Sequence, residues 1–312
     1  MNSRHIIAES WYFTRENKKL MWWYAFFPSL LTTLIGILYL TYQFFAFKRS
    51  PLFEDAPRSF LTEVITTTFG FLKQNEKLLI PAIITIVVVL LLYALLPTLL
   101  QGGLIQIIAK KRKGEQVKTS DGITYGFLAF LPLLEYHLLI KGFSLFSLFT
   151  EAGFILRNLG PGALTTLLPV FIAAAVIGLI LTLLFTYSEF FIVLDKKPVL
   201  RSMGRSAKLV VLSWQHTFLI AILMLIIGLR IIINIIAVLL VPALLFFSAG
   251  FLATLTLTKI GIIVGTIVGL FVLFVASYFT GILNVFANAV WTFTFLELMH
   301  EKRTHEFLSD EK

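Results

Sequence analysis

The chain has 312 residues, of which 58% are hydrophobic and only 14% are charged, and its formal net charge is +9. A soluble domain of this size carries about 25% charged residues, so the composition excludes an ordinary soluble fold. The chain contains no cysteine, which excludes disulfides, thiolate metal sites and cysteine nucleophiles.

Long apolar runs predict an all-α fold, a multipass transmembrane helical bundle of about six spans with additional interfacial amphipathic helices. A helix rises 1.5 Å per residue, so crossing roughly 30 Å of hydrocarbon takes about 20 apolar residues. The expected spans are about 22–46, 79–108, 126–158, 164–193, 214–240 and 260–281. Because the segments between them are at most about 30 residues long, we expect residues 1–312 to form a single integral membrane domain.

The first two spans are preceded by polar leads of similar sequence. Residues 13–20 (FTRENKKL) match residues 71–78 (FLKQNEKL) at an offset of 58 residues. An ancient duplication would produce this match, and so would the general similarity of polar helix leads. Apolar residues recur near one face of residues 59–77, which predicts an interfacial helix before the second span.

Residues 121–158 are too long for a single crossing, because 38 helical residues extend about 57 Å. Pro132 lacks a backbone donor and is expected to break the helix. Two arrangements fit: an interfacial helix followed by a span, or one tilted and kinked span over 126–150 or 136–158.

Two basic loops are the most informative connections. Residues 109–121 (AKKRKGEQVKTSD) predict a helix end, a glycine turn and a new helix that begins near Ser120 or Asp121. Pro198 is expected to open an amphipathic helix through Val211. The cations of this helix, which we expect to contact anionic lipid headgroups, are Arg201, Arg205 and Lys208.

In the last third of the chain, the sequence allows two positions of one segment relative to the membrane. Residues 241–258 are apolar but begin with Val-Pro, so they either lie on the membrane or add a crossing. Gly261, Gly265 and Gly269 recur every four residues and form a stripe on which another helix can pack closely, within the chain or between subunits of a homo-oligomer.

Lys and Arg are distributed unevenly among the loops. With six spans, 17 of the 26 basic residues fall on the side of the termini, 7 on the other side and 2 within spans. The positive-inside rule then predicts a multi-pass cell-membrane protein with both termini, including the tail 300–312, in the cytoplasm. This pattern accounts for the net charge without a nucleic-acid partner.

Polar residues within apolar spans are functional candidates, since burying them in lipid is costly. The candidates are Glu135, His137, Lys141, Glu189, Arg230 and Asn234. Arg230 either snorkels to the outer headgroups or forms an ion pair or anion site. Glu189 is near enough in sequence to the inner interface to meet Arg201, Arg205 or His216. No catalytic, cofactor-binding or metal-ligating residue is predicted, since phosphate loops and paired carboxylates are missing from the sequence.

Three segments resemble poorly characterised bacterial families. Residues 101–115 resemble the "Gly-x-Ile, basic, Gly-Glu" segment that follows the second span in these families. Residues 189–214 resemble their inner helix with the pattern "Ala-x-x-x-Ser-x-x-Leu, Trp". Residues 289–303 resemble their last helix, with the pattern "Tyr-x-Asp-Leu-Arg". The families are the YciC-like integral membrane proteins and the membrane domain that precedes some glycerophosphodiester phosphodiesterases. This chain departs from them in its final helix and in lacking a phosphodiesterase domain. The resemblance implies six helices and no established activity, and it carries no site residues over.

Three functions compete. The first is a non-enzymatic envelope protein, a scaffold or lipid-contacting protein whose partners are the lipid bilayer and anionic headgroups, with no cofactor. The second is a transporter or channel for a small solute or lipid, which predicts that polar candidates converge on a cavity near the midplane. The third is a membrane-embedded lipid enzyme, which the lack of an acid or metal cluster in the sequence disfavours.

Overall fold

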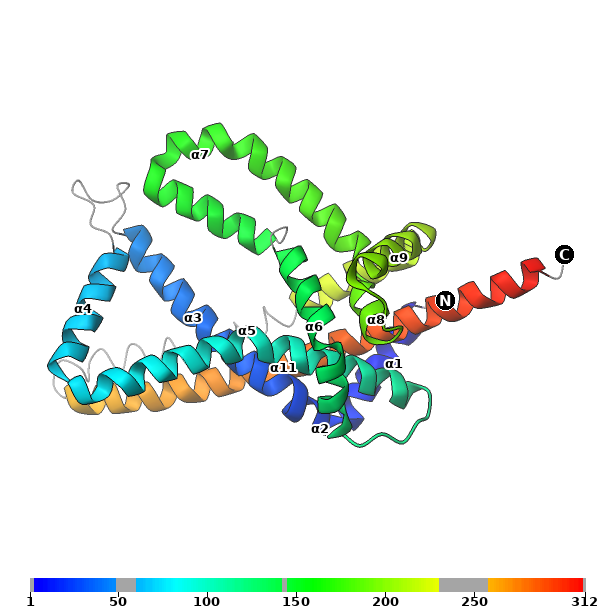
Figure 1. The fold of residues 1–312 in the computed structure, drawn as a ribbon, viewed down its shortest axis with the longest axis horizontal. Coiled ribbons are helices and arrows are strands. Elements are labelled where there is room, and N and C mark those ends of the chain that lie inside the picture. Colours follow the sequence, from blue (N-terminus) through cyan, green and yellow to red (C-terminus); the bar gives the residue numbers. More distant parts are fainter. Residues whose placement is uncertain (1–2, 49–59, 142–144, 230–257, 311–312) are drawn as a thin grey trace. The chain divides into compact units, whose positions relative to one another are not determined.

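The computed structural model describes residues 3–48, 60–141, 145–229 and 258–310, which are helical apart from short turns and contain no strand (Figure 1). The helices are α1 (Ser3–Glu16), α2 (Lys18–Leu20), the π-helix η1 (Met21–Phe26), α3 (Phe27–Lys48), α4 (Phe60–Gln74), α5 (Glu76–Arg112), α6 (Asp121–Lys141), α7 (Leu145–Leu184), α8 (Ser188–Val193), α9 (Val199–Leu212), the helical stretch Trp214–Leu229 and α11 (Thr258–Asp310). The prediction of an all-α fold is confirmed.

Five segments of the described chain are long and apolar enough to cross a membrane. They are Lys18–Lys48, Glu76–Arg112, Asp121–Ile140, Ser147–Leu184 and Ile267–Glu301. The bent pair formed by α9 and Trp214–Leu229 supplies a sixth if it is one broken span. The rest of the predicted span 214–240, and residues 241–257, lie outside the described residues. The predicted fold class, a multipass transmembrane helical bundle, is therefore confirmed.

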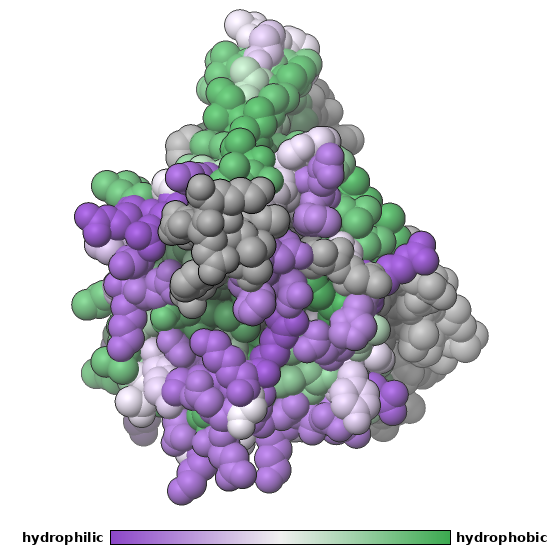
Figure 2. All heavy atoms as spheres, turned by 90° about the vertical axis from the view of Figure 1, so that its right-hand side faces the viewer, coloured by the Kyte–Doolittle hydropathy of each residue, from purple (hydrophilic) through white to green (hydrophobic). Residues whose placement is uncertain are grey.

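The surfaces of these helices are apolar where a soluble protein would be polar. Ile80 in α5 is 66% exposed, Leu131 in α6 is 72% exposed and Phe149 in α7 is 79% exposed. In Figure 2, hydrophobic side chains gather in the upper part of the view, separate from the hydrophilic side chains of its lower part. Apolar patches of this extent mark a surface that lipid covers.

The helices pack as two compact units, and their boundaries fall inside continuous helices. Unit 1 comprises Met1–Thr33, Leu100–Phe127 and Leu212–Lys312, and unit 2 comprises Leu34–Leu99 and Leu128–Val211. In unit 1, α11 packs against both α1 and η1. The side chains that are almost fully buried in this unit include Leu20, Tyr24, Leu104, Ile105, Ile107, Ile108, Val285 and Phe293.

Two glycines let α5 and α6 approach closely in unit 1. A Cβ atom on Gly103 would lie 2.1 Å from the carbonyl oxygen of Gly122. A Cβ atom on Gly122 would lie 2.5 Å from the hydroxyl of Tyr24, which donates a hydrogen bond to the carbonyl of Thr119. Only a hydrogen atom fits at either glycine, so the two backbones and the tyrosine ring form one tight crossing.

The predicted glycine stripe at residues 261, 265 and 269 differs from this close crossing. A Cβ atom on Gly269 would meet nothing within 4 Å among the described residues. The surroundings of Gly261 and Gly265 lie outside the described side chains. Close packing at the stripe, and a homo-oligomer through it, stay predictions.

Arg112, the last residue of α5, joins three segments of unit 1 that lie far apart in sequence. Its Nε and Nη2 donate to the two carboxylate oxygens of Glu9 in α1, at 3.2 and 3.3 Å. Nη2 also lies 3.3 Å from Glu297 Oε2 in α11, and Nη1 donates to the carbonyl of Phe293 at 2.6 Å. The guanidinium lies 4.5 Å from the Phe293 ring centroid, a cation–π distance. This bidentate, charge-assisted arrangement fixes the N-terminal helix to α5 and α11.

The connection after α5 has the predicted form. The helix ends at Arg112, and Gly114 has a φ of +81°. The N–H of Glu115 donates to Lys110 O at 3.1 Å and that of Gly114 to Lys111 O at 3.0 Å, which is the Schellman pattern. The next helix begins at Asp121, whose carboxylate accepts the N–H of Lys118. The predictions of a glycine turn and of a helix start at residue 121 are confirmed.

The predicted break at Pro132 is wrong, because α6 continues through it from Asp121 to Lys141. Pro81 and Pro97 likewise lie inside α5. Apolar helices accommodate proline when neighbouring groups satisfy the freed carbonyl. The sharp bend lies instead in α7 at Gly160, whose φ of +83° and ψ of 174° are accessible only to glycine.

The similar leads before the first two spans also have the same hydrogen bonds. Asn17 and Asn75 each end a lead, and their side-chain amides donate to the carbonyls of Phe13 and Phe71 at 2.9 and 3.0 Å. Asn158 donates to Phe154 O at 2.8 Å just before the bend of α7, so the Phe-x-x-x-Asn pattern occurs a third time. The two leads therefore share this local hydrogen bond, and the ancient duplication stays a prediction.

Candidate functional site

The candidate site is a chain of three polar side chains in unit 2. His137 Nε2 lies 2.9 Å from Glu189 Oε1, and His137 Nδ1 lies 3.1 Å from Thr98 Oγ1. The Thr98 residue is only 5% exposed, and the side chains of His137 and Glu189 are 29% and 21% exposed. Three helices, α5, α6 and α8, therefore meet at one partly buried polar chain, which we call the histidine cluster.

A break in the helix places Glu189 at this point. The backbone leaves helical geometry between α7 and α8, and the carbonyls before the break need donors. The hydroxyl of Tyr136 donates to Phe185 O at 3.0 Å, and the hydroxyl of Ser206 in α9 donates to Leu184 O at 2.7 Å. Ser206 Oγ also accepts the N–H of Tyr187 at 2.9 Å. These hydrogen bonds across the break hold α8 in the position where Glu189 meets His137.

The histidine cluster can hold or release a proton without losing a hydrogen bond. In neutral His137 the Nε2–H group donates to Glu189, and Nδ1 accepts from the Thr98 hydroxyl. After protonation both ring nitrogens donate, and the hydroxyl of Thr98 turns from donor to acceptor. A threonine hydroxyl suits this position because it can play both roles.

The structure brings together two of the six polar candidates. Glu135, which the transport hypothesis placed in the same cavity, is exposed on α6. Arg230, Asn234 and the side chain of Lys141 lie outside the described residues. Sequence reasoning missed Thr98, although a hydroxyl directly after Pro97 within an apolar run is a polar signal of the kind that marked the other candidates.

The cations Arg201, Arg205 and Lys208 lie exposed on α9, as a stripe at spacings of four and three residues. The opposite face of α9 is buried through Val199, Ser202, Ser206, Leu209 and Val210. Apolar groups flank the cations: Leu200 is 74% exposed and Val211 is 63% exposed. We call this combination the α9 face. Arg205 Nη1 lies 3.9 Å from Asp195 Oδ2, so one cation is partly paired. The predicted amphipathic helix after Pro198 is confirmed.

The described residues contain no group of three or more His, Cys, Asp or Glu side chains that could hold a metal ion. Together, the spanning helices, their apolar surfaces and the partly buried polar chain define the class of this protein, a multipass helical membrane protein. No family model, curated protein or solved structure matches the chain. Its resemblance to the YciC-like and phosphodiesterase-associated membrane families stays a prediction.

The pair of His137 and Glu189 makes a testable contribution to stability. We expect His137→Leu to lower the free energy of unfolding by about 1–3 kcal/mol, because Glu189 loses the partner at 2.9 Å. The double variant with Glu189→Leu should recover part of this loss, giving a coupling energy of about 1 kcal/mol. Unfolding of the wild type, the two single variants and the double variant in mixed detergent micelles, followed by tryptophan fluorescence, measures the free energies of this double-mutant cycle. Additive losses, with no coupling, would contradict the pairing.

Proposed function

We propose that this protein is a lipid-contacting, non-enzymatic protein of the cell membrane that holds anionic phospholipid against the α9 face on the cytoplasmic side. The observation that carries the proposal is the α9 face itself: three exposed cations on one helix, next to exposed apolar side chains. A helix of this type lies at the headgroup boundary, with its cations among phosphates and its apolar groups among acyl chains.

The position of α9 in the fold supports this orientation. It follows directly after the spanning helix α7 and the short α8, which supports a position at the membrane surface at the end of that crossing. Ser206 bonds α9 to the break between these helices, which fixes its buried face and leaves the cations outward. Trp214, two residues beyond α9, is 59% exposed, and tryptophan favours headgroup depth.

Neutralising the stripe should remove the preference for anionic lipid. Each cation near an anionic surface contributes about 1 kcal/mol, so the triple variant Arg201→Gln, Arg205→Gln, Lys208→Gln should lower the preference by up to about 3 kcal/mol, roughly a hundredfold. Native mass spectrometry of the full chain with equimolar dioctanoyl phosphatidylglycerol and phosphatidylcholine measures which lipid is retained.

The matched control removes the same charge from exposed lysines on three other helices, as Lys48→Gln, Lys73→Gln, Lys77→Gln. This control should keep most of the preference, because its cations are not gathered on one helix face. Equal losses in the two triple variants would show that total charge, and not the α9 face, selects the lipid, and would overturn the proposal.

A second candidate function, proton-linked transport, is favoured by the histidine cluster. Histidine–carboxylate pairs at membrane depth are the chemistry of proton relays. Pyranine-loaded proteoliposomes with an imposed pH gradient test it. Proton-linked transport predicts that the wild-type chain dissipates the gradient faster than His137→Gln. Lipid contact alone predicts equal rates.

A further inference from the structure

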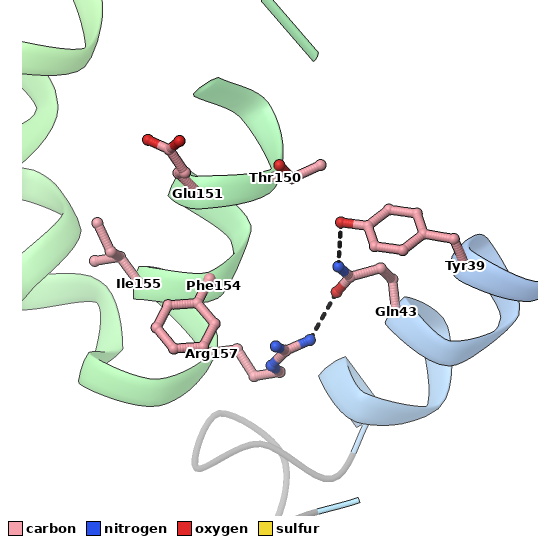
Figure 3. A pocket seen from close by; sticks show the side chains of 7 residues that line it. All are labelled: Tyr39, Gln43, Thr150, Glu151, Phe154, Ile155 and Arg157. Carbon is pink, nitrogen blue, oxygen red and sulfur yellow. Dashed lines mark hydrogen bonds between the residues drawn. The ribbon is translucent and has the colours of Figure 1, made fainter. Parts of the chain in front are cut away.

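A pocket of about 390 Å³ lies between α3 and α7 in unit 2 (Figure 3). Its lining includes Tyr39 and Gln43 from α3 and Thr150, Phe154 and Arg157 from α7. The volume falls in the range of small-ligand and headgroup sites. The walls combine aromatic rings with one cation, which is the composition that binds an organic anion.

Arg157 is held in place in this pocket by side chains of both helices. Its Nη1 donates to Gln43 Oε1 at 2.6 Å, and the Gln43 amide donates to the hydroxyl of Tyr39 (Figure 3). The guanidinium carbon lies 5.5 Å from the Tyr42 ring centroid and 5.8 Å from that of Phe154. The hydrogen bond to Gln43 orients the guanidinium before a ligand binds. It uses only one of the five N–H donors of the guanidinium.

We expect the pocket at headgroup depth, because Arg157 lies just before the bend of α7 at Gly160. The straight part of α7 after the bend, residues 161–184, extends about 36 Å, the thickness of a hydrocarbon core with its boundaries. Arg157 lies just before this part, and the α8–α9 segment follows just after it. The pocket and the α9 face are therefore expected at opposite faces of the membrane.

We propose that this pocket binds the phosphodiester group of a phospholipid headgroup, with Arg157 as its anion ligand. A planar guanidinium makes bidentate hydrogen bonds to phosphate oxygens. Phe154 and Ile155 provide apolar lining for the start of an acyl chain. Glu151 also lines the pocket, with its carboxylate pointing away from Arg157 in Figure 3. The negative charge of Glu151 repels a dianionic free phosphate more strongly than a singly charged phosphodiester, so it favours the diester. This site is separate from the α9 face and does not depend on it.

Photo-cross-linking of the full chain tests the proposal. The probe is phosphatidylethanolamine with a diazirine at the headgroup end of one acyl chain, and digestion followed by mass spectrometry locates the labelled peptides. We expect labelling of residues 34–48 and 145–160, and Arg157→Gln should lower it about tenfold. Arg157→Lys should keep part of it, since lysine retains the charge but not the fork. Lys73→Gln removes the same charge from α4 and should leave labelling unchanged.

Two readouts keep the outcome decisive. Labelling of the lipid-exposed residues 78–95 of α5 reports that each variant is folded and embedded, and it should not change. Dioctanoyl phosphatidylethanolamine should compete with the probe, and inorganic phosphate at the same concentration should not. Equal labelling in the wild-type chain and Arg157→Gln would overturn the site. Equal competition by inorganic phosphate would show a free-anion site and overturn the lipid assignment.

Discussion

Replacing Arg112 by leucine should lower the free energy of unfolding by about 3 kcal/mol. The side chain is only 18% exposed and is bonded to Glu9, Glu297 and the carbonyl of Phe293. Without the guanidinium, two carboxylates face each other with no cation between them. The N-terminal helix would then lose its polar attachment to α5 and α11.

Thermal unfolding in detergent micelles, followed by tryptophan fluorescence, measures this loss. The matched control is Lys110→Gln, two residues earlier in the same helix. The ion pair of Lys110 with Glu115 is exposed, at 32% and 47%, so its loss should change stability by less than about 1 kcal/mol. Similar effects of the two substitutions would contradict the central role of Arg112 in unit 1.

Gly103→Val should destabilise the protein by about 3 kcal/mol or more. The Cβ atom of any larger residue would lie 2.1 Å from the carbonyl oxygen of Gly122, and a backbone oxygen cannot rotate away. The α5–α6 crossing must therefore open, which also disturbs Tyr24 and its hydrogen bond to Thr119.

The control for this effect is Gly36→Ala in α3. A Cβ atom there meets nothing within 4 Å among the described residues, and alanine is favoured over glycine inside a helix by up to about 1 kcal/mol. Gly36→Ala should be neutral or stabilising in the same unfolding measurement. A stable Gly103→Val variant would show that the two helices do not approach as closely as the structure has them.

The sequence predicted those features that depend on local chemistry. The glycine turn at Gly114, the helix start at Asp121 and the helix after Pro198 each follow from one to three neighbouring residues. The prediction of a break at Pro132 was wrong because proline weakens a helix without ending it when the surroundings are apolar. Gly160 bends α7 instead, since its backbone conformation requires glycine.

The long-range contacts could not be predicted from one sequence. His137 and Glu189 were both candidates, but their pairing spans 52 residues and includes Thr98 from a third helix. Arg112 was counted only as one of several loop cations, because nothing near it in sequence identifies Glu9 or Glu297 as partners. Periodic spacing suggested close packing at Gly269, whereas the closest approach among the glycines that the structure describes is between Gly103 and Gly122, which follow no such period.

We expect α9 and the Arg157 pocket at opposite faces of the membrane. A cysteine-accessibility experiment tests this placement directly, because the chain has no native cysteine. Single cysteines replace Asn158, before the long straight part of α7, and Lys196, between α8 and α9. With a membrane-impermeant thiol reagent on intact cells, we expect labelling of Asn158→Cys at once and of Lys196→Cys only after permeabilisation. Labelling of both positions from the same side would show that α7 does not cross the membrane.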